Sequence, residues 1–194
     1  MYLYGASGHA KVVKDILESS GKPISGFVDD NPELREFAGM PVMRSAESLE
    51  PFIVSIGSNK IRKMIVERLN TKFAIGIHPT AVISPSAIIS TGTVVMPGSV
   101  INADTYIGNH CIINTGATID HECQLEDYVH VSPNATLCGN VQVGEGTWVG
   151  AGSVIIQGIK IGRWSQIGAG SVVVNDIPDG VMAFGNPCRI IRTL

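Results

Sequence analysis

The sequence is poor in charged residues and has no long hydrophobic run. Only 16% of the 194 residues are charged, a low share for a globular monomer, which predicts that part of the surface is buried in an oligomer. The net charge of −3 and the lack of a basic cluster argue against nucleic acid or an anionic membrane as partners. No apolar run reaches the roughly 18 residues of a transmembrane helix, and the start lacks signal-peptide features. We therefore expect a cytoplasmic protein without membrane insertion.

The cysteines lack the close pairing that is typical of zinc sites, since even the nearest two lie twelve residues apart. We interpret all four as reduced thiols packed in or near the core, namely Cys111, Cys123, Cys138 and Cys188. The histidines contain no H-x₄-H pair either, so no metal site is predicted.

What the sequence does have is an aliphatic residue at every sixth position from Ile77 to Val173. A small or β-branched residue follows four places later, as in Ala81, Ala87 and Thr93. A period of six fits neither an α-helix nor a flat strand, but it is the signature of a hexapeptide parallel β-helix that closes one triangular coil in eighteen residues. We predict such a coil over residues 77–178, with three buried columns. The series is Ile77, Ile83, Ile89, Val95, Ile101, Ile107, Ile113, Ile119, Leu125, Val131, Leu137, Val143, Val149, Ile155, Ile161, Ile167 and Val173.

Residues 1–76 have a different pattern, in which short apolar strands alternate with amphipathic helices. This order predicts a small Rossmann-like α/β domain with a parallel sheet. The helices are expected after Gly8 and after Asn59, and residues 31–51 are expected to form a loop with little regular structure. The predicted strands are Tyr2–Tyr4, Ile24–Val28, Phe52–Ile56 and Phe73–Ile75.

The first strand leads into Gly5-Ala6-Ser7-Gly8-His9, a turn whose backbone N–H groups and following helix N-terminus suit an anion. The second strand ends at Asp29, where such domains place a carboxylate that binds a ribose hydroxyl or a base edge. The G-x-x-G pattern is incomplete, so a dinucleotide site is not expected. A tight turn that merely requires glycine is the competing interpretation.

One hexad of the coil, Ile119–Gln124, departs from the repeat because it places His121 at a corner. Gly139 follows eighteen residues later and is therefore expected one coil above the imidazole, with its N–H uncovered. This arrangement suits a general base beside an oxyanion donor. Either Glu122 or Asp120 can orient the imidazole, with Glu122 favoured, and a solvated or packing histidine is the alternative.

Other polar residues depend on a second subunit, since an isolated triangular prism has convex faces and no deep pocket. Asn114 and His130 could then line a cleft with His121, although His130 fits a packing role equally well. We interpret His78 and His110 as surface or interdomain residues. Cys123 lies near His121, but its small-residue position points it inward, which disfavours a covalent acyl-enzyme.

Together these motifs resemble the bacterial nucleotide-sugar acetyltransferases of the sialic-acid O-acetyltransferase (NeuD) and bacillosamine N-acetyltransferase (PglD) type. The resemblance covers essentially the whole chain. It rests on the hexads and on Gly5–His9, Asp29-Asp30, Ile56–Asn59, Ile119–Cys123 and the tail Gly185–Arg189. It implies a left-handed β-helix, a homotrimer, and a C-terminal tail over residues 179–194 near the coenzyme A site.

The resemblance also implies an activity, namely acetyl-CoA-dependent N-acetylation of a UDP-4-amino sugar in glycan biosynthesis, without a metal. His121 would be the general base, Glu122 would orient it, and the Gly139 N–H would receive the oxyanion. The nucleotide sugar would lie on Gly8, His9, Asp29 and Asn59. Acetyl-CoA would lie between two protomers, near Asn114, His130, Gly139, Ile155, Gly185, Asn186 and Pro187.

Three other functions fit the same fold. The nearest is an O-acetyltransferase acting on a sialic acid or related sugar through the same His121. A zinc enzyme of the γ-carbonic-anhydrase type needs three imidazoles at a subunit interface, which the histidine spacing does not favour. A non-catalytic nucleotide-binding scaffold would keep the fold without using His121.

Overall fold

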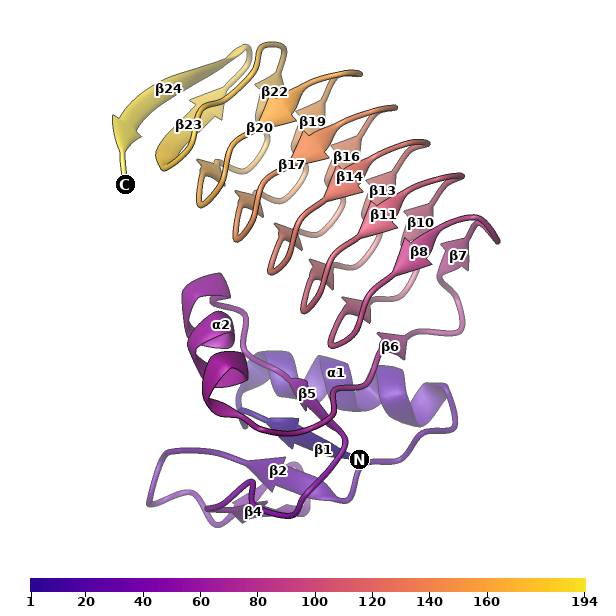
Figure 1. Ribbon diagram of the computed structural model, residues 1–194, viewed down its shortest axis with the longest axis vertical. Coiled ribbons are helices and arrows are strands. Elements are labelled where there is room, and N and C mark those ends of the chain that lie inside the picture. Colours follow the sequence, from indigo (N-terminus) through magenta and orange to yellow (C-terminus); the bar gives the residue numbers. More distant parts are fainter.

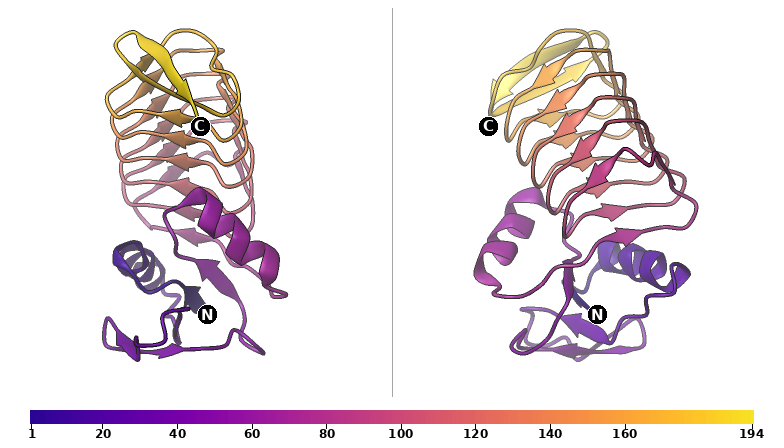
Figure 2. Two further views of the ribbon diagram at one scale, coloured as in Figure 1. Left: turned by 90° about the vertical axis from the view of Figure 1, so that its left-hand side faces the viewer. Right: turned by 45° about the vertical axis from the view of Figure 1, so that its right-hand side comes forward.

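A computed structural model describes residues 1–194 and places a triangular coil of strands on a small α/β unit (Figure 1). The N-terminus lies in the α/β unit, whereas the C-terminal hairpin closes the far end of the coil (Figures 1 and 2). The coil is a left-handed parallel β-helix, as predicted. Neither helix of the chain is long and apolar enough to cross a membrane.

The α/β unit is built on a sheet of order β3-β4-β2-β1-β5. Its central strands β1 (Tyr2–Tyr4), β2 (Gly26–Val28) and β5 (Phe52–Val54) are parallel, which confirms the predicted parallel sheet. The two predicted helices are present as α1 (Gly8–Ser19) and α2 (Asn59–Arg68). The apolar side of α1 is buried through Val13, Ile16 and Leu17.

Two predictions for this unit are wrong. Residues 31–51 are not irregular, because they contain β3 (Glu36–Phe37) and β4 (Met40–Met43), and β4 joins the sheet parallel to β2. Only Val42 of β4 is buried, so the strand carries no apolar alternation to reveal it. The expected strand Phe73–Ile75 forms only a single bridge to Phe52, because the chain there already turns toward the coil.

The coil contains three parallel sheets, which we name by their outer surfaces. The junction face holds β6 (Gly76–Ile77), β9 (Val94–Val95), β12 (Ile112–Ile113), β15 (His130–Val131), β18 (Trp148–Val149) and β21 (Gln166–Ile167), extended by β23 (Val181–Gly185) and β24 (Cys188–Thr193). The uncharged face holds β7 (Val82–Ile83), β10 (Val100–Ile101), β13 (Thr118–Ile119), β16 (Thr136–Leu137), β19 (Val154–Ile155) and β22 (Val172–Val173). The polar face holds β8 (Ile88–Ile89), β11 (Tyr106–Ile107), β14 (Gln124–Leu125), β17 (Gln142–Val143) and β20 (Lys160–Ile161).

Every strand pair from β6 to β22 joins residues that are eighteen apart, as the three predicted columns require. Ile119, for example, stacks between Ile101 and Leu137. The inward aliphatics and the small residues between them form one cluster of 25 buried residues. Cys111 and Cys123 are fully buried members of it, which agrees with their interpretation as core thiols. Since full burial of an aliphatic side chain contributes about 1.5–3 kcal/mol, the repeat alone supplies a continuous core.

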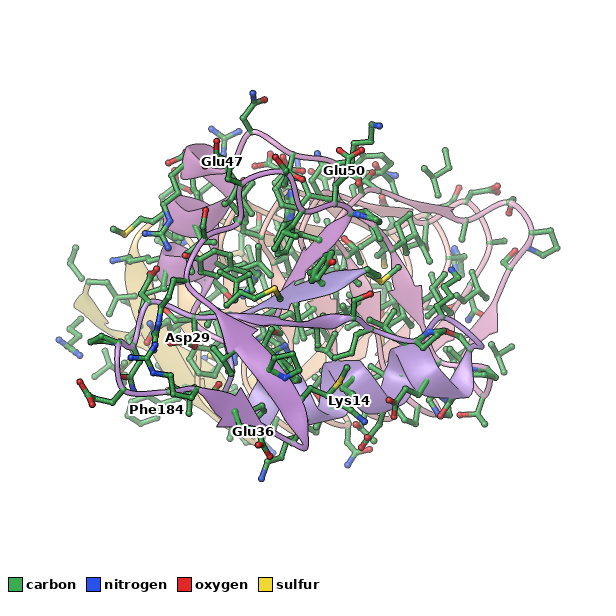
Figure 3. All side chains as sticks on the ribbon, turned by 90° about the horizontal axis from the view of Figure 1, so that it is seen from below. Lys14, Asp29, Glu36, Glu47, Glu50 and Phe184 are labelled. Carbon is green, nitrogen blue, oxygen red and sulfur yellow. The ribbon has the colours of Figure 1, made fainter.

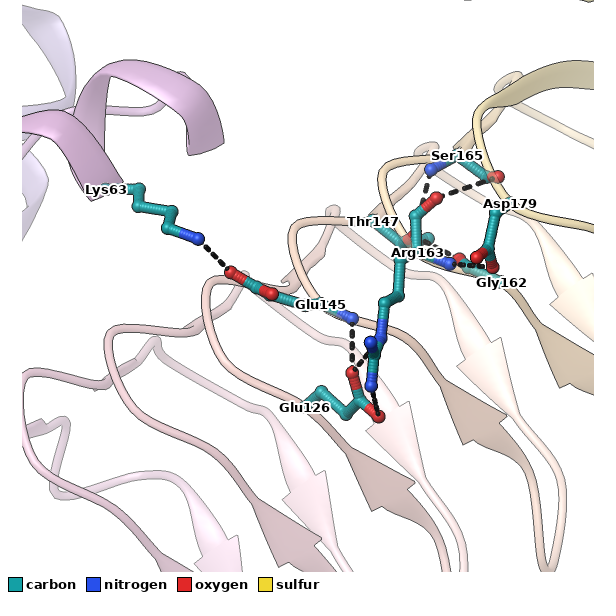
Figure 4. Close-up of polar contacts among 8 residues, drawn as sticks. All are labelled: Lys63, Glu126, Glu145, Thr147, Gly162, Arg163, Ser165 and Asp179. Atoms are coloured by element: carbon teal, nitrogen blue, oxygen red, sulfur yellow. Dashed lines mark hydrogen bonds and ion pairs between the residues drawn. The ribbon is translucent and has the colours of Figure 1, made fainter.

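The α/β unit packs on the lower part of the junction face. The larger of its two clusters joins Leu3 and Leu17 to the coil residues Val94, Met96 and Ile112. Polar contacts add to this apolar junction at the edge of the coil, where Lys63 of α2 lies 2.6 Å from Glu145 (Figure 4). The N–H of Glu145 in turn donates to Glu126, so the contact is anchored to the coil backbone.

Candidate active site

His121 lies in the turn that leads from the uncharged face to the polar face, between β13 and β14. Its Nδ1 is 3.0 Å from Oε2 of Glu122, and both side chains are more than half exposed. Because an ionised carboxylate only accepts hydrogen bonds, Nδ1 carries the proton and Nε2 keeps a lone pair. The imidazole therefore presents a basic nitrogen to solvent.

Asp120 takes no part in orienting the ring. Its Oδ1 accepts hydrogen bonds from the N–H of His121 at 2.8 Å and from the amide of Asn102 at 2.9 Å. These bonds hold the pKa of Asp120 below its usual range and keep it ionised. Of the two carboxylates that flank the imidazole, only that of Glu122 reaches it.

Gly139 lies directly over the imidazole, as the eighteen-residue phasing predicts. A Cβ at this position would come within 2.6 Å of both Cε1 and Nε2 of His121. The N–H of Gly139 donates no hydrogen bond within the chain, although its carbonyl accepts one from Gly158. A free N–H donor and a basic nitrogen thus lie side by side over an open corner, an arrangement that suits acyl transfer.

Asn114 and His130 lie at the opposite edge of the uncharged face from His121, so one chain does not bring the three residues together. His130 Nε2 is 3.0 Å from the Asn114 amide, and its ring stacks on Trp148 at a centroid distance of 5.3 Å. They line a groove of about 540 Å³ along the junction face, whose walls also include Pro133, Ile167, Met182 and Phe184. Trp148 was not predicted as a groove residue, although it stacks on His130 from eighteen residues later in the repeat.

The glycine turn of the α/β unit precedes α1, whose first residue is Gly8. Asp29 fixes this turn, since its carboxylate accepts hydrogen bonds from the N–H of Ala6 at 2.8 Å and of Asn31 at 2.9 Å. Asp29 lies at the end of β2, and Figure 3 shows its position when the unit is seen from below. The neighbouring carboxylate of Asp30 instead contacts Tyr4 and Arg68.

His9 and His130 are both largely buried at the junction between the α/β unit and the coil. Burial and the positive charge of Arg62 lower the pKa of His9 to about 4 and that of His130 to about 3. Nε2 of His9 and Nδ1 of His130 have no hydrogen-bond partner. The neutral imidazole of His130 therefore brings a free polar atom to the groove, and His9 is a second such imidazole at the same junction.

The remaining predicted residues are placed as follows. Asn59 is buried, and its amide donates to the carbonyl of Gly146 at 3.0 Å, so this side chain already serves the contact between α2 and the coil. Ile155 points into the coil core and is fully buried, which leaves only its backbone for a ligand. Gly185 ends β23 next to the groove residue Phe184, and Asn186 and Pro187 form the turn of the C-terminal hairpin. His110, expected at the surface or between domains, is buried at the junction against Phe73.

Comparison with known proteins links both halves of the chain to one enzyme family. Residues 1–69 match the PglD N-terminal domain, and residues 140–175 match the bacterial transferase hexapeptide repeat. UDP-N-acetylbacillosamine N-acetyltransferase of Bacillus subtilis is 43% identical over an alignment of 107 residues, and the match covers 48% of this chain and 50% of that protein. The chain thus spans about half the length of this curated relative.

Solved structures match over nearly the full length. PerB from Caulobacter crescentus, determined with CoA and GDP-perosamine, is 38% identical, with a TM-score of 0.93 and coverage of 98% of this chain and 96% of that one. The acetyltransferase domain of PglB from Neisseria gonorrhoeae, determined with acetyl coenzyme A, is 38% identical, with a TM-score of 0.91 and 98% coverage of both chains. On this likeness over both domains, the chain belongs to the PglD-type family of nucleotide-sugar acetyltransferases.

Proposed function

We propose that the protein transfers the acetyl group of acetyl-CoA to the amino group of a nucleotide-linked 4-amino sugar. The observation that carries this proposal is the corner at which Glu122 holds Nδ1 of His121 and Gly139, whose N–H donates no hydrogen bond, lies over the Nε2 side of the ring. The relatives support the reactants, because PerB was solved with CoA and a GDP-linked amino sugar. The B. subtilis relative is named as an N-acetyltransferase of a UDP-linked sugar.

In the proposed reaction Nε2 of His121 removes a proton from the sugar amine as its nitrogen attacks the thioester carbonyl. The carbonyl oxygen becomes an oxyanion that accepts the Gly139 N–H. When the tetrahedral intermediate collapses, the C–S bond breaks, and the thiolate of CoA leaves and takes up the proton. General base catalysis of this kind contributes about 10²–10⁴-fold. Glu122 stabilises the imidazolium that forms in between.

A second copy of the chain completes the site in this proposal, as part of a homotrimer. The uncharged face has a column of outward residues without a single charge, formed by Val82, Val100, Thr118, Thr136, Val154 and Val172. Such a face suits contact between protomers. His121 lies at one edge of this face and the groove with Asn114 and His130 at the other, so packing of two copies brings His121 of one to the groove of the next.

The ligands divide between the two domains. The groove, with its apolar walls and the hairpin turn Gly185–Pro187 above it, suits the pantetheine arm of acetyl-CoA. The N-terminus of α1 at Gly8 and His9 suits the pyrophosphate of the nucleotide sugar, because the free N–H groups of the first turn face it. Asp29 contributes by holding this turn.

The test is a coupled assay of CoA release with acetyl-CoA and matched UDP- and GDP-linked 4-amino sugars, together with their 4-hydroxy counterparts. We expect turnover with an amino sugar, a product acetylated on nitrogen by mass spectrometry, and none with its hydroxy counterpart. Turnover with the hydroxy sugars alone would identify an O-acetyltransferase. Sedimentation of the same sample checks the trimer, and a monomer with full activity would contradict the shared site.

A further inference from the structure

Arg62 of α2 is the largest fully buried side chain of the protein, with an exposed fraction of 1%, and it has no carboxylate partner. Removing a charge from water without a counter-ion costs several kcal/mol unless polar groups replace the lost hydration. All five N–H donors of the guanidinium are in fact hydrogen-bonded. The acceptors are the carbonyls of Ile56, Gly57, His110 and Tyr128 and the Oδ1 of Asn59, at 2.8–3.3 Å.

These acceptors belong to two different parts of the molecule. Ile56 and Gly57 form the turn after β5 in the α/β unit, whereas His110 and Tyr128 are corners of successive coils that lie eighteen residues apart. Asn59, the fifth partner, continues the connection by donating to the carbonyl of Gly146 one coil higher. The planar fork of Arg62 therefore ties one turn of the α/β unit to three levels of the coil.

The same turn borders the buried histidines of the groove. The carbonyl of Gly57, which accepts from Nη1 of Arg62 at 3.3 Å, lies beside the ring of His130 without a well-formed hydrogen bond to Nδ1. His9 lies close enough to His130 that a positive charge on His9 would oppose the protonation of His130. Arg62 is the charged side chain whose field reaches both His9 and His130, and no carboxylate offsets it at either ring.

We propose that Arg62 is a positioning residue of the reaction, which fixes the Ile56–Gly57 turn and the His9–His130 pair in one arrangement on the coil. This inference rests on the proposed function, because it assumes that the pair borders the substrates. Arg62 touches neither ligand and acts through the groups it holds. Its fork sets the position of the turn, and its charge adds to the larger effect of burial in keeping both imidazoles neutral, so that each offers one N–H and one lone pair at working pH.

The experiment compares Arg62→Met, which removes charge and fork, with Arg62→Lys, which keeps the charge but not the planar fork. Lys63→Met is the matched control, because the neighbouring Lys63 also joins α2 to the coil, through Glu145 at its surface. Steady-state kinetics gives kcat and KM for both substrates. Nuclear magnetic resonance follows the histidine Cε1 protons from pH 7.5 to 4, with signals assigned through His9→Gln and His130→Gln.

We expect Arg62→Met to lower kcat/KM by more than tenfold and to raise the pKa of His9 and His130, while burial still holds both below the ordinary value, which shifts the acid limb of the pH–rate profile. Arg62→Lys is expected to fold and to keep both low pKa values, yet to lose kcat/KM by about tenfold. Lys63→Met should change kcat/KM by no more than about twofold and should leave the pKa values of both histidines unchanged.

Several results would overturn the proposal. They are an Arg62→Lys enzyme with wild-type kcat/KM, or a folded Arg62→Met enzyme whose histidine pKa values and pH profile are unchanged. If Arg62→Met does not fold, Arg62→Lys decides by its kinetics. The titration does not depend on turnover, so failure of the proposed function would appear as absent acetyl transfer with shifted histidines, and failure of this inference as unshifted histidines.

Discussion

The coil and the α/β unit both have apolar cores, but they build these cores in different ways. The coil forms a cluster of 25 buried residues from its own repeat. The α/β unit has clusters of 13 and 5 residues, and the larger includes Val94, Met96 and Ile112 of the coil. The coil is therefore self-sufficient, whereas the α/β unit depends on the coil beneath it. In our proposal the coil carries the catalytic groups and the α/β unit binds the nucleotide.

Substitution of His121 is the most direct test of the proposal that the catalytic groups lie on the coil. We expect His121→Ala to lower kcat by about 10²–10⁴-fold, since the general base is lost. KM for both substrates should stay near the wild-type value, because the groove and the glycine turn are untouched. The measurement is steady-state CoA release with the true acceptor.

Because the His121 side chain is 55% exposed, its removal should leave the melting temperature and the oligomeric state unchanged. His78→Ala is the control, as a histidine of the first coil away from the corner. Turnover of His121→Ala within a few-fold of wild type would remove the general base from the mechanism.

Alanine substitutions at Ile112 and Ile113, neighbours in β12, test whether the core of the α/β unit depends on that of the coil. Both are at most 1% exposed, but Ile112 packs into the α/β unit and Ile113 into the coil. Each alanine substitution should cost about 2–5 kcal/mol of unfolding free energy. Urea unfolding measures the loss, and hydrogen exchange locates it.

We expect Ile112→Ala to increase exchange in α1 and β1 while the coil stays protected. Ile113→Ala should increase exchange in the neighbouring coils and, through the shared cluster, in the α/β unit as well. Equal exchange patterns for the two variants would contradict the one-way dependence.

The sequence was most informative where the structure repeats. The six-residue period predicts every strand pair of the coil, and the phase predicts Gly139 over His121, because each coil copies the backbone of the previous one. The α/β unit has no such repeat. The strand β4 was missed since only Val42 is buried there, and Arg62 was missed since nothing local distinguishes it from other helix-surface cations.

The geometry around His121 was predictable from the sequence only in part. The sequence left Glu122 and Asp120 as competing partners of His121, because side chains at a corner do not alternate strictly between two faces. The structure resolves the contact, since the carboxylate of Glu122 reaches Nδ1 of the ring while Asp120 accepts the backbone N–H of His121. Glu122 has a φ of +59°, as do the equivalent corners of neighbouring coils within a few degrees. A left-handed backbone at a non-glycine residue costs about 1–2 kcal/mol. The position of the partner protomer follows from no single-chain pattern.

A smaller effect is expected when the space over the imidazole is filled. Gly139→Ala would place a Cβ 2.6 Å from Nε2 of His121, so the ring must move. A displacement of about 1 Å at a reacting group can cost on the order of 10²-fold, and we expect a loss of that size in kcat. The oxyanion donor itself is kept, because alanine retains its N–H.

A double-mutant cycle with His121→Ala checks the cause of this loss. If Gly139→Ala acts by displacing the imidazole, its effect should shrink strongly when the imidazole is absent. Full additivity of the two losses would instead indicate that Gly139 acts through the coil backbone.

The smallest of these effects concerns the α/β unit. Asp29→Ala removes the hydrogen bonds to Ala6 and Asn31, which loosens the turn before α1 without touching the coil. We expect KM for the nucleotide sugar to rise by about tenfold, since turn N–H groups that are no longer fixed bind a pyrophosphate less well. KM for acetyl-CoA should not change. Asp30→Ala is the control, because the neighbouring carboxylate contacts Tyr4 and Arg68 rather than the turn. An equal loss of both substrates in Asp29→Ala would mean that the two regions do not divide recognition and chemistry between them.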